Sequence, residues 1–284
     1  MSVYKSFAVI GGGTVGLPVV NALAAKNVAV VLLSRPGSST KTAPPGVQVV
    51  QVDLTDTAAV AAVFKEHKVD VALSTVGRGG VVAQKLLVDA AKLGAVKLFF
   101  PSEYGMPTDI VGASTEGPLA AKNHIAAYLK SVNIPSTRVF TGPFIEFIPW
   151  LVDYSDGGKF KVVGQGEVQI SFTSITDIAG FLAYILTSLP PSELENRVLR
   201  LEGERTSLKD LAAQFKTSVE RVDSFPGEGG QIKTALHNVI EAGAGSTGWD
   251  WAKNAEGTGS NAAGSANALW PGHQWKSIKE VHNL

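Results

Sequence analysis

The first residues that could do chemistry are three glycines near the start of the chain. Gly11, Gly13 and Gly16 have the spacing G-x-G-x-x-G and lie between an apolar run, FAVI, and a helical pattern, LPVVNALAAK. In such a strand–turn–helix the first glycine permits a tight turn, the second lets the backbone approach a pyrophosphate, and the third lets helix and strand pack closely. The helix N-terminus favours the anion. The pattern predicts a dinucleotide site; a glycine-rich turn in another kind of α/β protein is the alternative.

The end of the second apolar run indicates which dinucleotide binds. NAD sites usually have a carboxylate there for the ribose 2′-hydroxyl, whereas this chain has LLSRPGSSTK, with Ser34 and Arg35. An arginine can bind a 2′-phosphate through several planar hydrogen bonds, with Ser38, Ser39 or Lys41 in support. We therefore expect NADP(H) as the cofactor. The alternative is that Arg35 is only a solvated loop residue.

Asp53 ends the third apolar run, VQVVQVD. Its carboxylate could accept a hydrogen bond from the adenine, or it could cap the helix that begins near Thr55. Both roles stay open from the sequence.

One lysine lies on the apolar face of a predicted helix. In PLAAKNHIAAYLK, residues 118–130, the helical period gathers one apolar stripe, which contains Leu119, Ala121, Ile125, Tyr128 and Leu129. Lys122 lies inside this stripe, so it must reach solvent, form a pair or line a pocket. In a partly apolar wall beside a cationic nicotinamide, its pKa would fall and it could act as a general acid or base near neutral pH. Binding of the nicotinamide ribose is a second role that the sequence does not separate from proton transfer.

Aromatic residues supply candidates for a substrate site. Tyr104 follows the fifth apolar run, at the end of a strand where open α/β sheets bind their ligands. Phe144, Phe147 and Trp150 lie in GPFIEFIPWLVDY and could stack on an aromatic substrate. Packing against the core is the alternative for all four residues.

The composition excludes several classes of function. The chain has 25 basic and 25 acidic residues and no cysteine, so we expect no nucleic-acid or anionic-membrane surface, no disulfide and no thiolate chemistry. His124, His273 and His282 show no spacing typical of a metal site, and we predict no metal. With no apolar run of membrane-spanning length and no leader-like start, a cytoplasmic protein with a small-molecule substrate is expected.

The elements that must position these residues alternate between short apolar runs and helical segments. The runs are FAVIG, VAVVLLS, VQVVQVD, VDVALST, VKLFFPS and STRVFTG. Continuous apolar runs are typical of strands buried on both faces. Six such strands with intervening helices predict an α/β Rossmann fold, a doubly wound parallel sheet.

The pattern changes after this sheet. We expect an NADP-binding core over residues 1–142, with 172–202 packing back onto it, and a smaller C-terminal substrate lobe from 143–171 and 203–284. GKFKVVGQGEVQISF predicts two short strands around a glycine turn. The Gly/Ala/Ser/Asn-rich stretch 256–268 is typical of a flexible linker, with a lid as the alternative.

Together with VDVALSTVG, FFPSEYG, the segment around Lys122, IPSTRVF and SFTSITDIAGF, the nucleotide motif resembles the NmrA-like and isoflavone-reductase-like family of atypical short-chain dehydrogenases, most of all its fungal members. The resemblance extends to LWPGHQWKSIKEV near the C-terminus. It implies that NADPH is surrounded by Thr14, Val15, Arg35, Asp53, Thr75, Val76 and Lys122. It also implies that Lys122 matches the single lysine that acts near the nicotinamide, and that Phe144, Phe147 and Trp150 border an aromatic substrate.

Two features depart from related patterns. Many relatives have G-x-x-G-x-x-G, whereas this chain has the shorter G-x-G-x-x-G spacing. This departure affects the loop contacts that the resemblance implies for Thr14 and Val15. Main-type short-chain reductases use Tyr-x-x-x-Lys, but the residue four before Lys122 is Pro118. If reduction occurs, Lys122 must handle the proton without that tyrosine.

These observations leave two classes of function. The first is an NADPH-dependent reductase of a small aromatic or conjugated molecule, in which Lys122 assists proton transfer. The second is a non-catalytic, NADP-binding redox sensor of the NmrA type, which would add a protein partner. A cofactor-assisted rearrangement without net redox chemistry is a third possibility.

Overall fold

The computed structural model describes residues 4–38, 43–80, 83–109, 118–155 and 158–284. The chain forms two compact units. Unit 1 comprises residues 1–103, 113–139 and 178–199, and unit 2 comprises 104–112, 140–177 and 200–284. Each unit is described below by itself.

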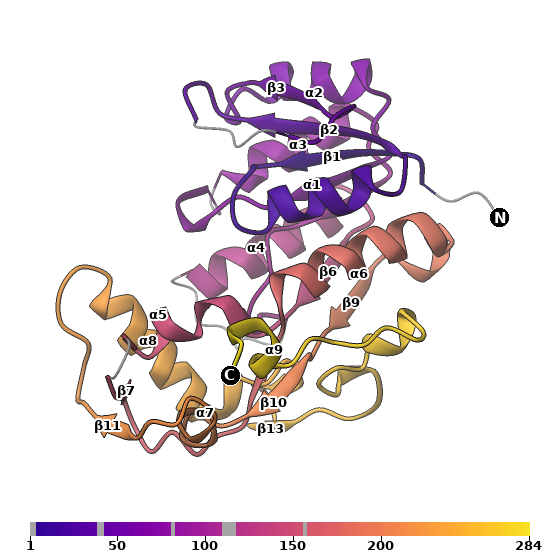
Figure 1. Cartoon of the computed structure of the whole chain (residues 1–284). Coiled ribbons are helices and arrows are strands. Elements are labelled where there is room, and N and C mark those ends of the chain that lie inside the picture. Colours follow the sequence, from indigo (N-terminus) through magenta and orange to yellow (C-terminus); the bar gives the residue numbers. More distant parts are fainter. Residues whose placement is uncertain (1–3, 39–42, 81–82, 110–117, 156–157) are drawn as a thin grey trace. The chain divides into compact units, whose positions relative to one another are not determined.

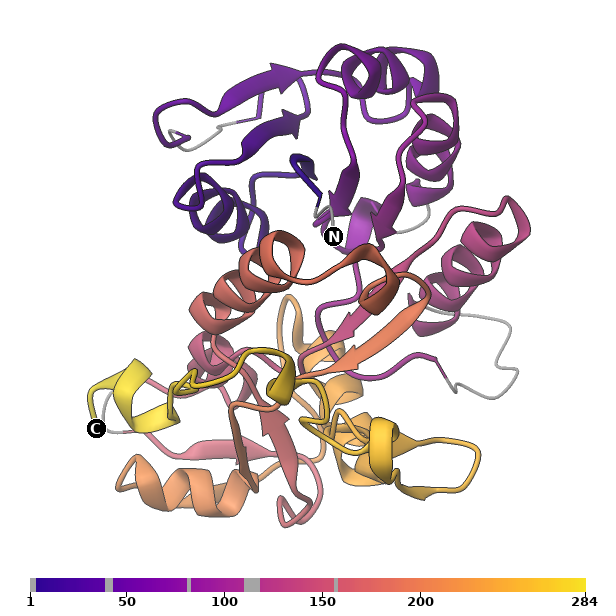
Figure 2. The ribbon, with the colours of Figure 1, turned by 90° about the vertical axis from the view of Figure 1, so that its right-hand side faces the viewer.

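Unit 1 is built on one five-stranded parallel sheet with the order β3-β2-β1-β4-β5. Its strands are β1 (Ser6–Ile10), β2 (Ala29–Ser34), β3 (Gln48–Gln51), β4 (Val71–Ser74) and β5 (Leu98–Phe100). The first helices of the unit are α1 (Gly16–Ala24), α2 (Thr57–Glu66), α3 (Gln84–Leu93) and α4 (Pro118–Ser131). Two views place α1 and α3 on opposite sides of the strands (Figure 1, Figure 2). The predicted Rossmann fold is confirmed.

The core of unit 1 explains why the apolar runs form strands. Every residue of β1 and β4 is buried, and alternate residues such as Ala8, Ile10 and Phe99 pack with side chains of α2, α3 and α4 in one cluster. Strands covered on both faces need continuous apolar sequence, which is the pattern the chain has.

The sixth predicted strand, β6 (Thr137–Phe140), does not extend the parallel ladder. It pairs with β9 (Arg197–Arg200) in a separate two-stranded sheet. Its link to β5 is one bridge between Phe99 and Ser136. Pro101 follows β5 and Pro135 precedes the bridge, and a proline has no N–H to donate to a ladder.

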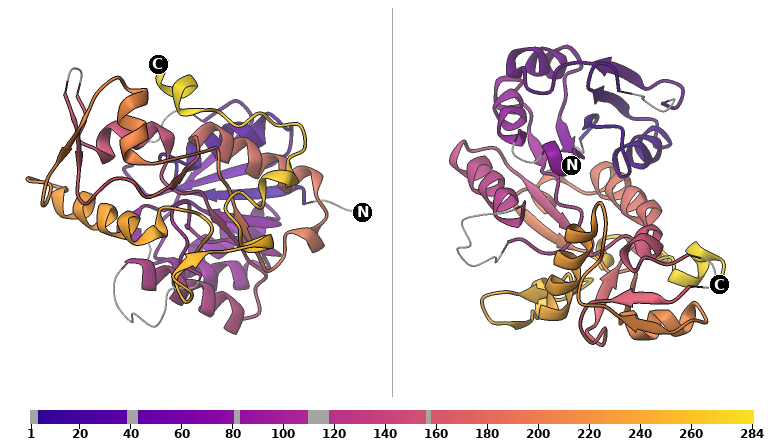
Figure 3. Two further views of the ribbon diagram at one scale, coloured as in Figure 1. Left: turned by 90° about the horizontal axis from the view of Figure 1, so that it is seen from below. Right: turned by 90° about the vertical axis from the view of Figure 1, so that its left-hand side faces the viewer.

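Unit 2 consists of short strands and helices around a second apolar core (Figure 3). Its strands are β7 (Phe160–Val162), β8 (Ile170–Phe172), β10 (Glu204–Thr206), β11 (Val219–Arg221), β12 (Trp249–Asp250) and β13 (Ala255–Glu256). Its helices are α5 (Ile148–Leu151), α7 (Leu208–Gln214), α8 (Gly230–Val239) and α9 (Ile278–His282), while α6 (Ile175–Ser188) begins in unit 2 and continues into unit 1.

The two short strands predicted around the glycine turn are present as β7 and β8, and each pairs with another strand: β7 pairs with β11 in parallel, and β8 pairs with β10 antiparallel. The intervening residues are held elsewhere, because the carboxylate of Glu241 accepts the N–H groups of Gln165 and Gly166. The stretch 256–268 is not a loose linker. It is tied down by the Gly257 N–H on the carbonyl of Gly248 and by the Asn267 side chain on the backbone of residue 202.

Candidate nucleotide site and lysine centre

The glycine loop connects β1 to α1 and requires glycine at two positions. Gly11 has φ +102°, a conformation that L side chains rarely adopt. At Gly16 a Cβ atom would lie 1.8 Å from the carbonyl oxygen of Gly11, so only glycine fits this close contact. Gly13 differs, because a Cβ there would meet nothing within 4 Å. The space beside Gly13 is therefore open to a group from outside the protein.

The N-terminus of α1 has no side-chain cap. Val15 is the N-cap residue and makes no capping hydrogen bond, and the first turn holds no acidic residue. The first N–H groups of a helix need acceptors, and the helix dipole favours an anion there. Thr14 and Gly13 are exposed beside it. The residues present thus fit a pyrophosphate group.

Hydrogen bonds hold the ends of neighbouring strands together at this edge of the sheet. The Thr75 hydroxyl donates to the carbonyl of Gly11 at 2.7 Å, and the Gly11 N–H donates to the carbonyl of Leu33 at 2.8 Å. The Ser102 hydroxyl donates to the carbonyl of Val76 at 2.9 Å. Because β1, β2, β4 and β5 are parallel, Gly11, Ser34, Thr75 and Ser102 all lie at the carboxyl edge, where such sheets bind ligands.

The residues after β2 and β3 complete the adenosine side of this edge. Ser34 is buried and Arg35 is exposed, and among the described residues no carboxylate pairs with Arg35. Lys41 and Ser39 lie outside the described residues. Asp53 accepts two hydrogen bonds from Thr55, which lower the pKa of its exposed carboxyl group. The cap of α2 is Asp56, which accepts the N–H of Ala59, so the capping role considered for Asp53 is wrong.

Lys122 is not a solvated lysine. Its side chain is 19% exposed, and its ammonium donates to the carbonyl oxygen of Glu103 at 2.5 Å. The Oε2 atom of Glu103 lies 3.9 Å away. The apolar stripe around it is confirmed in part, because Ile125 and Leu129 are buried in the core of unit 1. The lysine thus pairs with a polar group at the end of β5.

Glu103 follows the fifth strand at the ligand-binding end of the sheet, but the sequence did not indicate its contacts with Lys122 and Arg138. Its side chain is 1% exposed and its Oε1 atom accepts the Nε–H of Arg138 at 2.8 Å. Arg138, on β6, also donates to the side-chain oxygen of Asn123 at 2.9 Å. Arg138 is 35 positions from Glu103, and no local spacing announces the contact. We call Glu103, Lys122 and Arg138 the lysine centre.

The aromatic candidates lie in unit 2. Phe147 and Trp150 are each 43% exposed, and Phe144 packs edge-on against Phe147 with ring centroids 5.6 Å apart. Lys233 of α8 places its ammonium 5.5 Å from the Trp150 ring centroid, and the neighbouring Ile232 is 40% exposed. Ile232 and Lys233 were not anticipated, because nothing local relates α8 to α5. Tyr104 is buried, with φ +35°.

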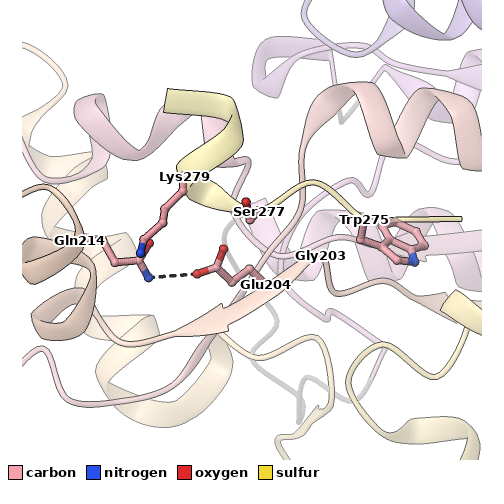
Figure 4. Close-up of a pocket in the computed structure, with 6 residues that line it drawn as sticks. All are labelled: Gly203, Glu204, Gln214, Trp275, Ser277 and Lys279. Carbon is pink, nitrogen blue, oxygen red and sulfur yellow. Dashed lines mark hydrogen bonds between the residues drawn. The ribbon is translucent and has the colours of Figure 1, made fainter. Parts of the chain in front are cut away.

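A pocket of about 440 Å³ lies elsewhere in unit 2 (Figure 4). Gly203, Glu204, Gln214, Trp275, Ser277 and Lys279 line it. The carboxylate of Glu204 is already bound by the Gln214 amide at 3.0 Å and by the Ile278 N–H at 2.7 Å. None of the predicted site residues lines this pocket. In the described part of the chain, no cluster of three or more His, Asp or Glu residues could hold a metal ion, and no helix is long and apolar enough to cross a membrane.

Comparison with known proteins places this geometry in a family. The family model described as NmrA-like matches residues 4–235. The chain belongs to the NmrA-like family. An isoflavone reductase homolog from Arabidopsis thaliana is 29% identical over 173 residues, which are 57% of this chain and 54% of that protein. The chain therefore matches about half the length of this relative.

Two further proteins extend the comparison. An NmrA-like family domain-containing oxidoreductase from Gibberella moniliformis is 27% identical over 243 residues, covering 78% of this chain and 77% of that protein. The NADPH complex of leucoanthocyanidin reductase from Vitis vinifera superposes with a TM-score of 0.79 at 19% identity and covers 98% of both chains. This likeness shows that the NmrA-like chain has the fold of that reductase.

Proposed function

We propose that this NmrA-like protein is an NADPH-dependent reductase of a small aromatic or conjugated molecule. The observation that carries the proposal is Lys122, whose ammonium is fixed to the end of β5 at the same sheet edge as the glycine loop. The relatives support it, since one is named as an isoflavone reductase homolog and the structural neighbour was solved with NADPH.

The glycine loop and the residues after β2 would hold the cofactor. Gly13 and the uncapped start of α1 suit the pyrophosphate, and Arg35 suits a 2′-phosphate. Thr75, Val76 and Ser34 would line the same edge, with Thr14, Val15 and Asp53 beside the nucleotide. Arg35→Ala should weaken NADPH binding about 10- to 100-fold, because charged hydrogen bonds to the phosphate are lost, and should leave NADH binding unchanged. Calorimetric titration of both nucleotides checks this, and equal weakening of both would contradict it.

The nicotinamide, when bound, supplies a hydride to a carbon of the substrate. The oxygen attached to that carbon then gains negative charge, either as a carbonyl being reduced or as a leaving ether oxygen. The Lys122 ammonium donates a proton to this oxygen, and the neutral amine takes a proton back from water. Substrate receives one hydride and one proton, so the reduction balances.

The exposed aromatic residues of unit 2 are proposed to bind the substrate ring. Phe147, Trp150 and Ile232 present apolar area to solvent within the unit, which is the surface an aryl group would cover. Phe144 supports Phe147 from the side.

The test follows NADPH oxidation with a panel of aryl ketones, enones and benzylic ethers. Lys122→Ala should reduce kcat about 10²- to 10⁴-fold, the usual contribution of a positioned acid, while NADPH binding stays within a few-fold of wild type. Lys122→Arg is the matched control, because it keeps the charge but cannot release a proton near neutral pH. Undiminished turnover by Lys122→Ala would overturn the proton step. NADP binding with no turnover across the panel would favour the redox-sensor alternative.

A further inference from the structure

We infer that Glu103 is a positioning residue that holds Lys122 in place as an ammonium ion, so that it works as a proton donor, and that Arg138 orients the Glu103 carboxylate. The inference rests on the proposed reductase function and goes beyond it, because it assigns the acid role to Lys122 and names the residues that enforce it. All residues involved belong to unit 1.

The first step is the position of the ammonium group. A lysine side chain has many rotamers and loses substantial entropy when it is fixed. The hydrogen bond to the Glu103 carbonyl at 2.5 Å anchors Nζ to the chain segment that leaves β5. The backbone there is itself held, since the Gln84 side chain accepts the Ser102 N–H at 2.8 Å. Lys122 therefore binds to a rigid support.

The second step is charge. Glu103 Oε2 lies 3.9 Å from the Lys122 nitrogen, and an opposite charge at that distance favours the charged form of lysine. The glutamate is almost fully buried, and a buried carboxylate is stable as an anion only when it is paired. Arg138 supplies that pair at Oε1, at 2.8 Å. The Glu103 carboxylate is thus paired at Oε1 while its Oε2 lies beside Lys122.

The third step concerns the charges within the lysine centre. Among the described contacts of these three residues, the Glu103 carboxylate lies beside two cations, Lys122 and Arg138. An excess positive charge at the carboxyl edge stabilises an oxygen that becomes negative during reaction. A simple structural salt bridge would need only Glu103 and Arg138.

Other described charges lie nearby and have partners of their own. On α3, Lys85 and Asp89 lie 3.6 Å apart, and the Tyr128 hydroxyl donates to Asp89. Lys85 also lies 4.3 Å from the centre of the Tyr128 ring. The described charged contacts of Glu103 include Lys122 of α4 and Arg138 of β6.

The experiment measures the charge of Lys122 without a substrate. Lysines are ¹³C-dimethylated, which keeps their charge, and the Lys122 methyl signal, assigned by its loss in Lys122→Arg, is titrated with pH in the apoprotein. Glu103→Gln should lower its titration midpoint by about one pH unit or more. Arg138→Met should raise the midpoint, because Lys122 then has the carboxylate to itself. The opposite directions keep the test valid if one of the two variants fails to fold.

The control is Asp70→Asn, which removes a different carboxylate of unit 1. Asp70 pairs with Lys97 at 2.7 Å and precedes β4, at the amino edge of the sheet. It should leave the Lys122 midpoint unchanged. Midpoints that stay the same in both Glu103→Gln and Arg138→Met would overturn the inference and leave a structural ion pair only.

Activity separates this inference from the proposed function. With NADPH and any substrate found in the panel, Glu103→Gln should lower kcat on the alkaline side, about tenfold at one pH unit above the new midpoint, with the NADPH Kd unchanged. If Lys122→Ala abolishes turnover while Glu103→Gln keeps the wild-type pH profile, the inference fails and the proposed function stands. If Lys122→Ala is fully active, the proton step of the proposed function fails.

Discussion

The two units of this chain are stabilised in different ways. Unit 1 is held by a five-stranded sheet whose central strands are completely buried and apolar, and its buried ion pair is at the carboxyl edge, between Glu103 and Arg138. The described residues of unit 2 form two-stranded sheets. It depends on buried polar side chains, including Arg200, whose side chain is 1% exposed.

The buried carboxylates of the two units differ in what they bind. In unit 2 the carboxylates satisfy the backbone: Glu146 accepts the Ile175 N–H, and Asp177 accepts the Lys276 N–H and binds His273. These contacts join segments that share no strand ladder. In unit 1 the Asp70 carboxylate likewise accepts the Lys5 N–H, whereas the Glu103 carboxylate pairs with Arg138 at the carboxyl edge of the sheet.

The largest loss of stability is expected when Arg200 is removed. Its guanidinium binds Asp109 at 2.5 Å and the carbonyl of Thr247 at 2.7 Å, and it lies 5.3 Å from the centre of the Phe140 ring. Arg200→Met should destabilise unit 2 by about 3–5 kcal/mol, because it leaves Asp109 as an uncompensated, largely buried charge. Native-state hydrogen exchange should show the loss first in peptides of unit 2.

Arg205→Met is the matched control for Arg200. Arg205 binds two carboxylates, those of Glu202 and Glu256, but unlike Arg200 its side chain is 32% exposed. Its replacement should cost about 1 kcal/mol or less. Equal losses in the two variants would show that burial does not set the strength of these pairs in unit 2.

Two glycine variants test the stability and the nucleotide binding of unit 1 separately. Gly16→Ala should destabilise this unit by about 1–3 kcal/mol, because its Cβ would overlap the Gly11 carbonyl, a backbone atom that cannot turn away. Gly13→Ala should leave stability unchanged, since its Cβ meets nothing, yet it should weaken NADPH binding by occupying the space of the pyrophosphate. Thermal unfolding and NADPH titration measure the two effects. Normal NADPH binding by Gly13→Ala would contradict the site.

The same contrast explains what the sequence could predict. Continuous apolar strands and a 3.6-residue helical period are local patterns, so the parallel sheet, α1 and the glycine loop were predicted correctly. Lys122 was identified because it breaks such a pattern. Its partner Glu103 was not identified, because Glu103, Asn123 and Arg138 meet only when β5, α4 and β6 come together.

Unit 2 could be predicted less well for a physical reason. Strands of three residues carry little periodic signal, and their partners are chosen by distant side chains. The partners of β7 and β8 were not predicted, and Glu241 holds the turn residues Gln165 and Gly166 from 76 and 75 positions away. The stretch 256–268 failed because a low-complexity composition says nothing about the Asn267 contacts that order it.

The smallest predicted effect tests one buried polar residue of unit 2 by pH. His237 is fully buried, its Nδ1 atom accepts the Val163 N–H at 3.2 Å, and its Nε2 atom lies 3.0 Å from the Leu151 carbonyl. Burial lowers its pKa below the ordinary 6.5, so the folded protein favours the neutral ring while the unfolded chain binds a proton. Stability is therefore complete above pH 6.5 and falls as the pH drops below it.

The loss is at most about 1.4 kcal/mol per pH unit, the linkage slope for one proton. Thermal unfolding between pH 5 and 8 should show a decrease in Tm on the acid side for wild type and a smaller decrease for His237→Gln, whose amide can replace one ring contact without titrating. Parallel pH profiles would place the acid sensitivity outside His237. A decrease confined to wild type would instead extend the comparison, because it would show that the stability of unit 2 depends on a buried ring that stays neutral, whereas unit 1 holds the Glu103–Arg138 ion pair at the carboxyl edge of its sheet.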